Sequence, residues 1–138
     1  MRKSIPVTIK KEVAIRAKHR CEYCLLSEQF SFYSFHIEHI RSLKHGGKSD
    51  LDNLAYCCPD CNFYKGSDIA TFGDNDDEII RFFNPRKDIW INHFELDLGK
   101  IYGKTEIGKS TESIFKFNEV ERLIFRNQLH NLELYPNF

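Results

Sequence analysis

The apolar residues near the start of the chain recur at the spacing of a helix. Ile9, Val13 and Ala17 lie four residues apart, so they would share one helical face. Thr8 precedes them and belongs to a residue type that often caps a helix N-terminus. The pattern predicts a helix from about Ile9 to about Lys18.

The stretch FSFYSFHIEHI, residues 30–40, alternates partly between apolar and polar side chains, as a half-buried strand does. A regular strand would place Glu38 and His39 on opposite faces, unless local twist or a bulge brings them together. The letters HGGK at residues 45–48 are typical of a turn that needs positive φ. Residues 50–54 then predict a short turn.

Pro59 suits the first turn of a helix, because its missing N–H would have no helical partner there. We expect a short helix that starts at this proline and carries Asn62 and Lys65. Its positive end would attract a phosphate. The acidic letters GDNDDE at residues 73–78 then predict a linker or solvated loop.

The last third of the chain shows a hairpin pattern followed by a helical one. Residues 90–105 predict a β-hairpin around Leu98-Gly99. Ser110 or Thr111 is expected to cap a last helix that ends near Leu132. Its expected inner face consists of Ile114, Val120, Leu123 and Ile124.

The chain has 138 residues, of which 41% are hydrophobic and 14% aromatic. That length suits one domain with a modest core, and the composition is typical of a globular protein rather than a disordered one. We therefore expect a single unit over residues 1–138. The sequence has no apolar run long enough to cross a bilayer and no secretory pattern at its start, so we expect a cytoplasmic protein with no membrane partner.

The formal net charge is zero, but the charges are unevenly distributed. In residues 1–20, Glu12 is the acidic residue, and the basic residues are Arg2, Lys3, Lys10, Lys11, Arg16, Lys18 and Arg20. Such a segment is suited to the phosphates of a nucleic acid. A solvated helix surface is the alternative interpretation.

The cysteines form two C-x-x-C pairs, Cys21 with Cys24 and Cys58 with Cys61. Two such pairs are the pattern of a four-sulfur zinc site, which leaves no open position for water and is therefore structural. A redox C-x-x-C is the alternative, although it needs only one pair. Cys57 lies outside the spacing, so we interpret it as a small buried residue.

Residues 35–66 resemble the HNH endonuclease motif. His39, Asn53 and Asn62 stand at its three signature positions, and Glu38 precedes the histidine. The resemblance implies an α+β fold with a ββα-metal core over about residues 18–70, stapled by the zinc site. The N-terminal helix would precede this core. An extension over about residues 80–138 would contain the hairpin and the last helix.

The resemblance also implies a role for each of these residues. His39 would be the general base that takes a proton from the attacking water, a role that suits imidazole at cellular pH. Glu38 and Asn62 would bind a catalytic Mg²⁺ or Mn²⁺ through oxygen atoms. Asn53 would tie the loop together and keep His39 oriented.

Each of these residues also has a structural alternative. His39 could be a hydrogen-bonded core histidine, and Asn53 and Asn62 could be turn and cap residues. His36 could assist the metal or be structural. Lys65 could contact a phosphate or lie on the outside of its helix.

The resemblance implies a metal-dependent endonuclease that hydrolyses phosphodiester bonds of DNA. The alternative is a zinc-stabilised module that binds nucleic acid without cleaving it. Such a module would need the four cysteines but not Glu38, His39 and Asn62 together, so their joint presence favours an enzyme. The sequence does not indicate an oligomeric state.

Overall fold

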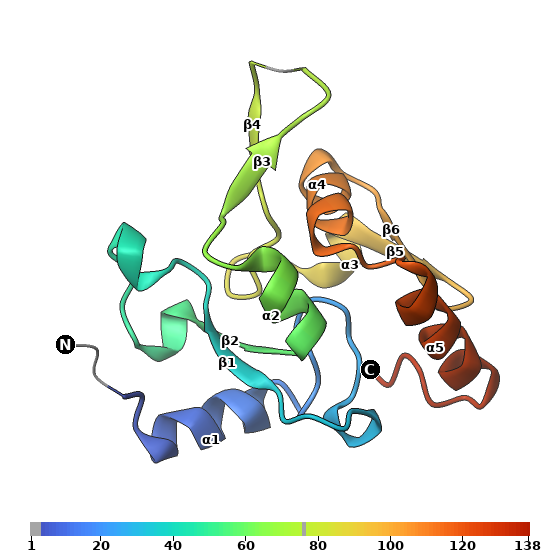
Figure 1. The fold of residues 1–138 in the computed structure, drawn as a ribbon, viewed down its shortest axis with the longest axis horizontal. Coiled ribbons are helices and arrows are strands. Elements are labelled where there is room, and N and C mark those ends of the chain that lie inside the picture. The colour runs from blue at the N-terminus through green and yellow to red at the C-terminus, as the bar shows by residue number, and fades with distance from the viewer. Residues whose placement is uncertain (1–3, 76) are drawn as a thin grey trace.

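The computed structural model describes residues 4–75 and 77–138 (Figure 1). Its helices and strands are α1 Val7–Arg16, β1 His36–His39, β2 Leu54–Cys57, α2 Pro59–Lys65, β3 Ala70–Phe72, β4 Ile79–Arg81, α3 Trp90–His93, β5 Phe94–Asp97, β6 Lys100–Gly103, α4 Glu106–Phe115 and α5 Val120–Asn131. Short 3₁₀ turns cover Glu28–Phe30, Leu43–His45 and Leu51–Asn53. Helices and small antiparallel sheets are mixed along the chain, which confirms the predicted α+β class.

The central unit consists of β1, β2 and α2, the predicted ββα arrangement. β1 and β2 pair antiparallel, with His36 opposite Cys57 and His39 opposite Leu54. Every residue of β2 is buried. Pro59 occupies the start of α2 as expected, and the Cys58 side chain caps that helix by accepting a hydrogen bond from the Cys61 amide. The cysteine pair is therefore built into the turn between β2 and α2.

The predicted boundaries near the N-terminus were wrong in two places. α1 begins at Val7 after Pro6, so Thr8 lies inside the helix and does not cap it. The strand expected over residues 30–40 is limited to β1, His36–His39. Its expected first part is irregular because the Phe35 amide donates to Glu28 Oε2 at 2.8 Å instead of to a neighbouring strand.

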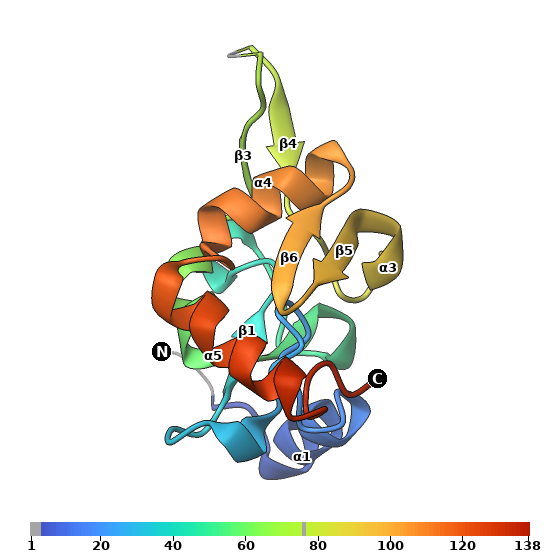
Figure 2. The same cartoon turned by 90° about the vertical axis from the view of Figure 1, so that its right-hand side faces the viewer.

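The segment expected as a linker or solvated loop lies between the two strands of a β-hairpin. Its described acidic residues, Asp74, Asp77 and Glu78, are exposed, as expected of a solvated loop. β3 and β4 pair antiparallel, with Phe72 opposite Ile79. This hairpin projects from the rest of the molecule (Figures 1 and 2). The strands were missed because they are three residues each, too short to show a clear alternation. Asp76, part of the acidic run, lies outside the described residues.

The β5–β6 hairpin around Leu98-Gly99 confirms the prediction for that segment. Leu98 and Gly99 both have positive φ, 53° and 92°. A side chain at Gly99 would be strained by this φ, and its Cβ would lie 2.7 Å from the Asn127 backbone nitrogen. The turn thus needs glycine both for its conformation and for close packing against α5.

The single last helix predicted from Ser110 or Thr111 is in fact two helices. α4 begins earlier, where the Thr105 side chain caps it by accepting from the Gly108 amide. It ends at Phe115, and the next residue, Lys116, caps it in a left-handed conformation with φ 50°.

The inner face predicted for the last helix was wrong at two of its four residues, whereas Ile114 packs against the core and Leu123 is half-buried. Val120 and Ile124 are 69% and 52% exposed. α5 buries Arg126 and Leu129 instead. The left-handed Lys116 interrupts the chain between α4 and α5, so the helical register before the break does not continue after it.

One continuous hydrophobic cluster joins the ββα unit to the segments on both sides of it. The cluster includes Val13 of α1, Leu54 of β2, Phe94 of β5 and Phe115 of α4. The residues after β4 therefore share their core with the unit that contains the cysteines. Among the described residues, no helix has the length and apolar character needed to span a membrane.

Candidate functional site

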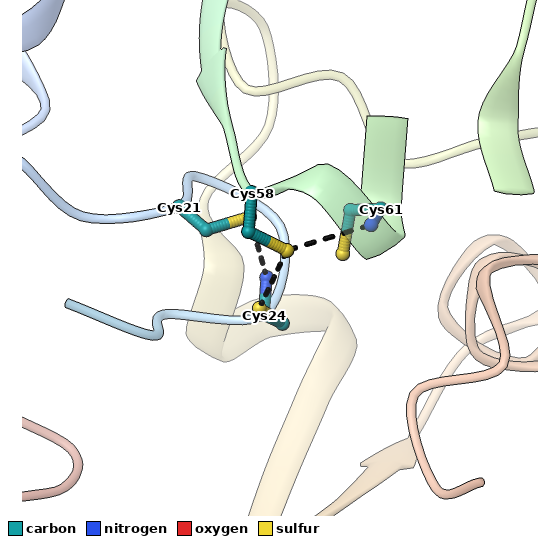
Figure 3. A group of neighbouring side chains, drawn as sticks. All are labelled: Cys21, Cys24, Cys58 and Cys61. Atoms are coloured by element: carbon teal, nitrogen blue, oxygen red, sulfur yellow. Dashed lines mark hydrogen bonds between the residues drawn. The ribbon is translucent and has the colours of Figure 1, made fainter. Parts of the chain in front are cut away.

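Four cysteine sulfurs meet between the ββα unit and the loop that follows α1 (Figure 3). The Sγ atoms of Cys21, Cys24, Cys58 and Cys61 all lie within 4.8 Å of one another, and all four residues are buried. The Sγ atoms of Cys24 and Cys58 are 3.7 Å apart. Tetrahedral zinc with bonds of about 2.3 Å separates its sulfur ligands by about 3.8 Å. The cluster could therefore bind zinc.

In each C-x-x-C segment, the backbone amide of the second cysteine donates a hydrogen bond to the sulfur of the first. The Cys24 amide donates to Cys21 Sγ at 3.5 Å, and the Cys61 amide donates to Cys58 Sγ at 3.4 Å. Cys57 is fully buried but directs its thiol to the Cys58 carbonyl at 3.5 Å. The two pairs therefore gather as the spacing predicted, and Cys57 lies outside the group.

His39 ends β1 at the rim of a cleft. The cleft has a volume of about 480 Å³ and is lined by His39, His36 and Lys10 together with mainly apolar side chains. The Nε2 atom of His39 lies 2.9 Å from the Ser49 hydroxyl oxygen. The imidazole is therefore held in place beside a cleft that is open to solvent.

Asn53 closes the loop that carries Ser49. Its Nδ2 donates to the carbonyls of Arg41 and Lys48, at 2.8 Å each, and its Oδ1 accepts from the Arg41 amide at 2.9 Å. Ser49 follows Lys48 directly, so the asparagine fixes the segment that contacts His39. No sequence motif had singled out Ser49, because its contact with the histidine depends on the path of this loop.

The two glycines of this loop serve different purposes. Gly46 has φ 81°, as the turn prediction required. Gly47 lies so close to the opposite side of the loop that a Cβ there would be 1.8 Å from the Arg41 carbonyl oxygen and 2.8 Å from Asn53 Nδ2. Any larger residue at Gly47 would separate the two sides that Asn53 joins.

Glu38 lies in the core, next to His39 in sequence but not in the cleft. It is 5% exposed, and its Oε2 accepts a hydrogen bond from the Tyr23 hydroxyl at 2.8 Å. Lys65 Nζ lies 2.5 Å from Oε1 and forms a buried ion pair with the carboxylate. Burial raises the pKa of Glu38, whereas the charge of Lys65 and the hydrogen bond from Tyr23 act against this rise.

The structure corrects both interpretations of Lys65, as a phosphate contact or as an exposed helix residue. It is 2% exposed, and its Nζ also donates to the His39 carbonyl at 3.3 Å.

Asn62 lies on the same helix and is half-buried. Its side chain makes no hydrogen bond within the described part of the chain. His36 is exposed and lines the cleft, whereas Glu38 is buried.

The basic N-terminal segment is only partly available to an external phosphate. Lys10, Lys11 and Lys18 are exposed. Arg16 instead donates to the carbonyls of Leu51 and Leu54, at 3.0 and 2.6 Å. Of the remaining basic residues, Arg20 donates to the Asn137 carbonyl, and Arg2 and Lys3 lie outside the described residues.

Comparison with known proteins identifies the central segment. The model of the HNH endonuclease family matches residues 21–68. No curated protein and no solved structure matched the chain. The matched segment begins at the first cysteine of the cluster and ends just after α2, so it includes the four cysteines and His39 with its supporting loop. α1 and all residues from β3 onward lie outside it.

Proposed function

Since residues 21–68 form an HNH domain, which supports nuclease activity, we propose that the protein is a metal-dependent endonuclease that hydrolyses phosphodiester bonds of DNA. The observation that carries this proposal is the position of His39. Its imidazole lines a solvent-open cleft and is oriented by Ser49. Lys10 lines the same cleft and supplies a positive charge that attracts a phosphate.

His39 acts as the general base in this proposal. A neutral imidazole at the cleft takes a proton from a water molecule, and the resulting hydroxide attacks the phosphorus atom while the 3′ oxygen leaves. Ser49 holds the ring, and Asn53 holds the loop of Ser49. Both are positioning residues, because they act through His39 and need not contact the DNA.

Zinc at the four-cysteine cluster has a structural role. Four thiolates complete a tetrahedral shell, so no position is left for water or substrate. The cluster joins the loop after α1 to the start of α2, and it thereby fixes the helix whose Lys65 contacts the backbone of His39.

Glu38 and Asn62 are the proposed ligands of the catalytic Mg²⁺ or Mn²⁺. A carboxylate and an amide supply the oxygen atoms that such hard ions prefer, and the ion would stabilise the charge of the leaving oxygen. Asn62 fits this role because its side chain is half-exposed. Glu38 fits it only if Lys65 moves, because the ammonium group now lies against its carboxylate.

Replacing Lys65 by methionine is expected to strengthen divalent binding by about tenfold or more, because juxtaposed like charges cost several kcal/mol. Glu38→Ala and Asn62→Ala are expected to weaken the binding of the divalent ion. Titration calorimetry with Mn²⁺ measures all three, with circular dichroism to confirm folding. Lys48→Met is the control, since it removes an exposed lysine of the same charge. Unchanged affinity in the Lys65 and Glu38 variants would exclude Glu38 as a ligand.

Purified protein incubated with supercoiled plasmid tests the activity itself. We expect nicked or linear DNA when Mg²⁺ or Mn²⁺ is added and intact plasmid when it is omitted. A gel-shift assay on the same samples measures binding. DNA that is bound but never cut under either ion would contradict the enzyme and support the non-cleaving module.

A further inference from the structure

The cysteine cluster has a charged neighbour that belongs to α5, outside the segment that matches the HNH family. Arg122 Nη2 lies 3.1 Å from Cys61 Sγ and 4.0 Å from Cys58 Sγ. The arginine side chain is 8% exposed. A buried guanidinium group is thus in direct contact with two of the sulfurs that could hold zinc.

The remaining contacts of Arg122 hold its guanidinium group in this position. Its Nη1 donates to the carbonyls of Phe115 and Lys116, at 2.6 and 3.1 Å, where α4 ends. Its Nε lies 3.7 Å from Asp60 Oδ2. The group therefore has a fixed orientation in which one amino group faces the sulfurs.

Charge explains why a cation would be placed there. Four thiolates around one Zn²⁺ carry a net charge of about −2, and a buried charge is costly unless another charge or hydrogen bonds compensate it. The four cysteines are at most 1% exposed, so water does little to solvate them. An N–H group that donates to a zinc-bound thiolate offsets part of this charge, as outer hydrogen bonds do at other metal sites.

The same C-terminal region also holds the first cysteine pair from outside. Trp90 Nε1 donates to the Tyr23 carbonyl at 2.8 Å, and the Tyr135 hydroxyl donates to the Cys24 carbonyl at 2.7 Å. Arg86 forms an ion pair with Glu22. Successive residues of the Cys21–Cys24 turn are therefore fixed by side chains that follow the HNH segment.

We propose that the C-terminal region completes the zinc centre, with Arg122 as the residue that neutralises the thiolate charge and sets how tightly zinc is retained. This inference rests on the proposed zinc occupancy of the cluster. It assigns a role to the residues after β4, whose function the HNH match does not cover. Arg122 is a positioning residue for the metal site and takes no part in the cleavage reaction.

Arg126 supplies a matched control on the same helix. It is 2% exposed and donates to the carbonyls of Gly99 and Phe117, but no sulfur lies among its hydrogen-bond partners in the described residues. Both arginines thus join α5 to neighbouring backbone, and only Arg122 contacts the cluster. A comparison of Arg122→Met with Arg126→Met separates the sulfur contact from general packing of the helix.

Zinc transfer to a coloured chelator is the main measurement, after elemental analysis of each purified protein. We expect Arg122→Met to release zinc about 10–100-fold faster or to bind it that much more weakly. Arg122→Lys keeps the charge and is expected to fall between Arg122→Met and the wild type. Arg126→Met is expected to stay within a few-fold of the wild type, and circular dichroism will show whether each variant is folded.

Cobalt provides a readout that packing alone would not change. In Co²⁺-substituted protein, the sulfur-to-cobalt charge-transfer band is expected to shift in Arg122→Met and to remain in place in Arg126→Met. Equal zinc release by the wild type and Arg122→Met, or the same acceleration and band shift in both methionine variants, would overturn the inference. Wild-type protein purified without zinc and unable to bind it would instead overturn the proposed zinc site.

Discussion

Cys24→Ser or Cys61→Ser is expected to leave the protein unfolded or aggregated, with less than one zinc per chain. A structural zinc site contributes on the order of 10 kcal/mol to folding, which is comparable with the entire net stability of a small domain. Both sulfurs belong to the buried group whose members lie within 4.8 Å of one another. Elemental analysis and circular dichroism measure the loss.

Cys57→Ser is the matched control for this experiment. Cys57 is as deeply buried as its neighbours, but its thiol faces a backbone carbonyl and lies outside the four-sulfur group. The serine variant is expected to fold, bind zinc and cleave DNA. Zinc loss in Cys57→Ser but not in Cys58→Ser would show that the ligand set is wrong. A Cys24→Ser protein that folds normally without zinc would contradict the structural role of the metal.

His39→Ala is expected to lower the rate of plasmid cleavage by about 10²–10⁴-fold, the usual contribution of a general base. The fold and the DNA affinity should stay nearly unchanged, because the side chain lies at the end of β1 and binds no zinc. Single-turnover cleavage, gel shift and thermal unfolding measure the three properties. Cleavage at the wild-type rate would exclude His39 as the base.

Ser49→Ala distinguishes the base from the residue that holds it. Removing the hydroxyl leaves the imidazole present but less well oriented, so the rate should fall less than in His39→Ala. A rate as low as that of His39→Ala would contradict a purely positioning role for Ser49.

Features set by short spacings in the chain were predictable from the sequence. The C-x-x-C pairs, the proline that starts α2 and the Leu98-Gly99 turn depend on hydrogen bonds and dihedral angles within a few residues. The role of Asn53 as the loop brace was instead implied by the resemblance to the HNH motif, and its hydrogen bonds to Arg41 and Lys48 agree with that role. Local chemistry therefore identified the two cysteine pairs, the start of α2 and the turn between β5 and β6.

Contacts between distant residues could not be predicted in this way. Nothing in the residues next to Glu38 indicated that Tyr23 and Lys65 would lie against its carboxylate. The short β3–β4 hairpin and the break between α4 and α5 were missed because nearby residues do not determine where such elements pair or end.

The sequence by itself determined the two cysteine pairs and the His39-bearing motif, because each depends on residue types at fixed short spacing. The α+β class followed from the resemblance of that motif to the HNH family. Only the tertiary structure decided which groups surround them. Arg122 reaches Cys61 from 61 positions along the chain. A buried charge needs a partner, and that partner can come from a distant part of the sequence. Packing of the whole core decides which group lies close enough.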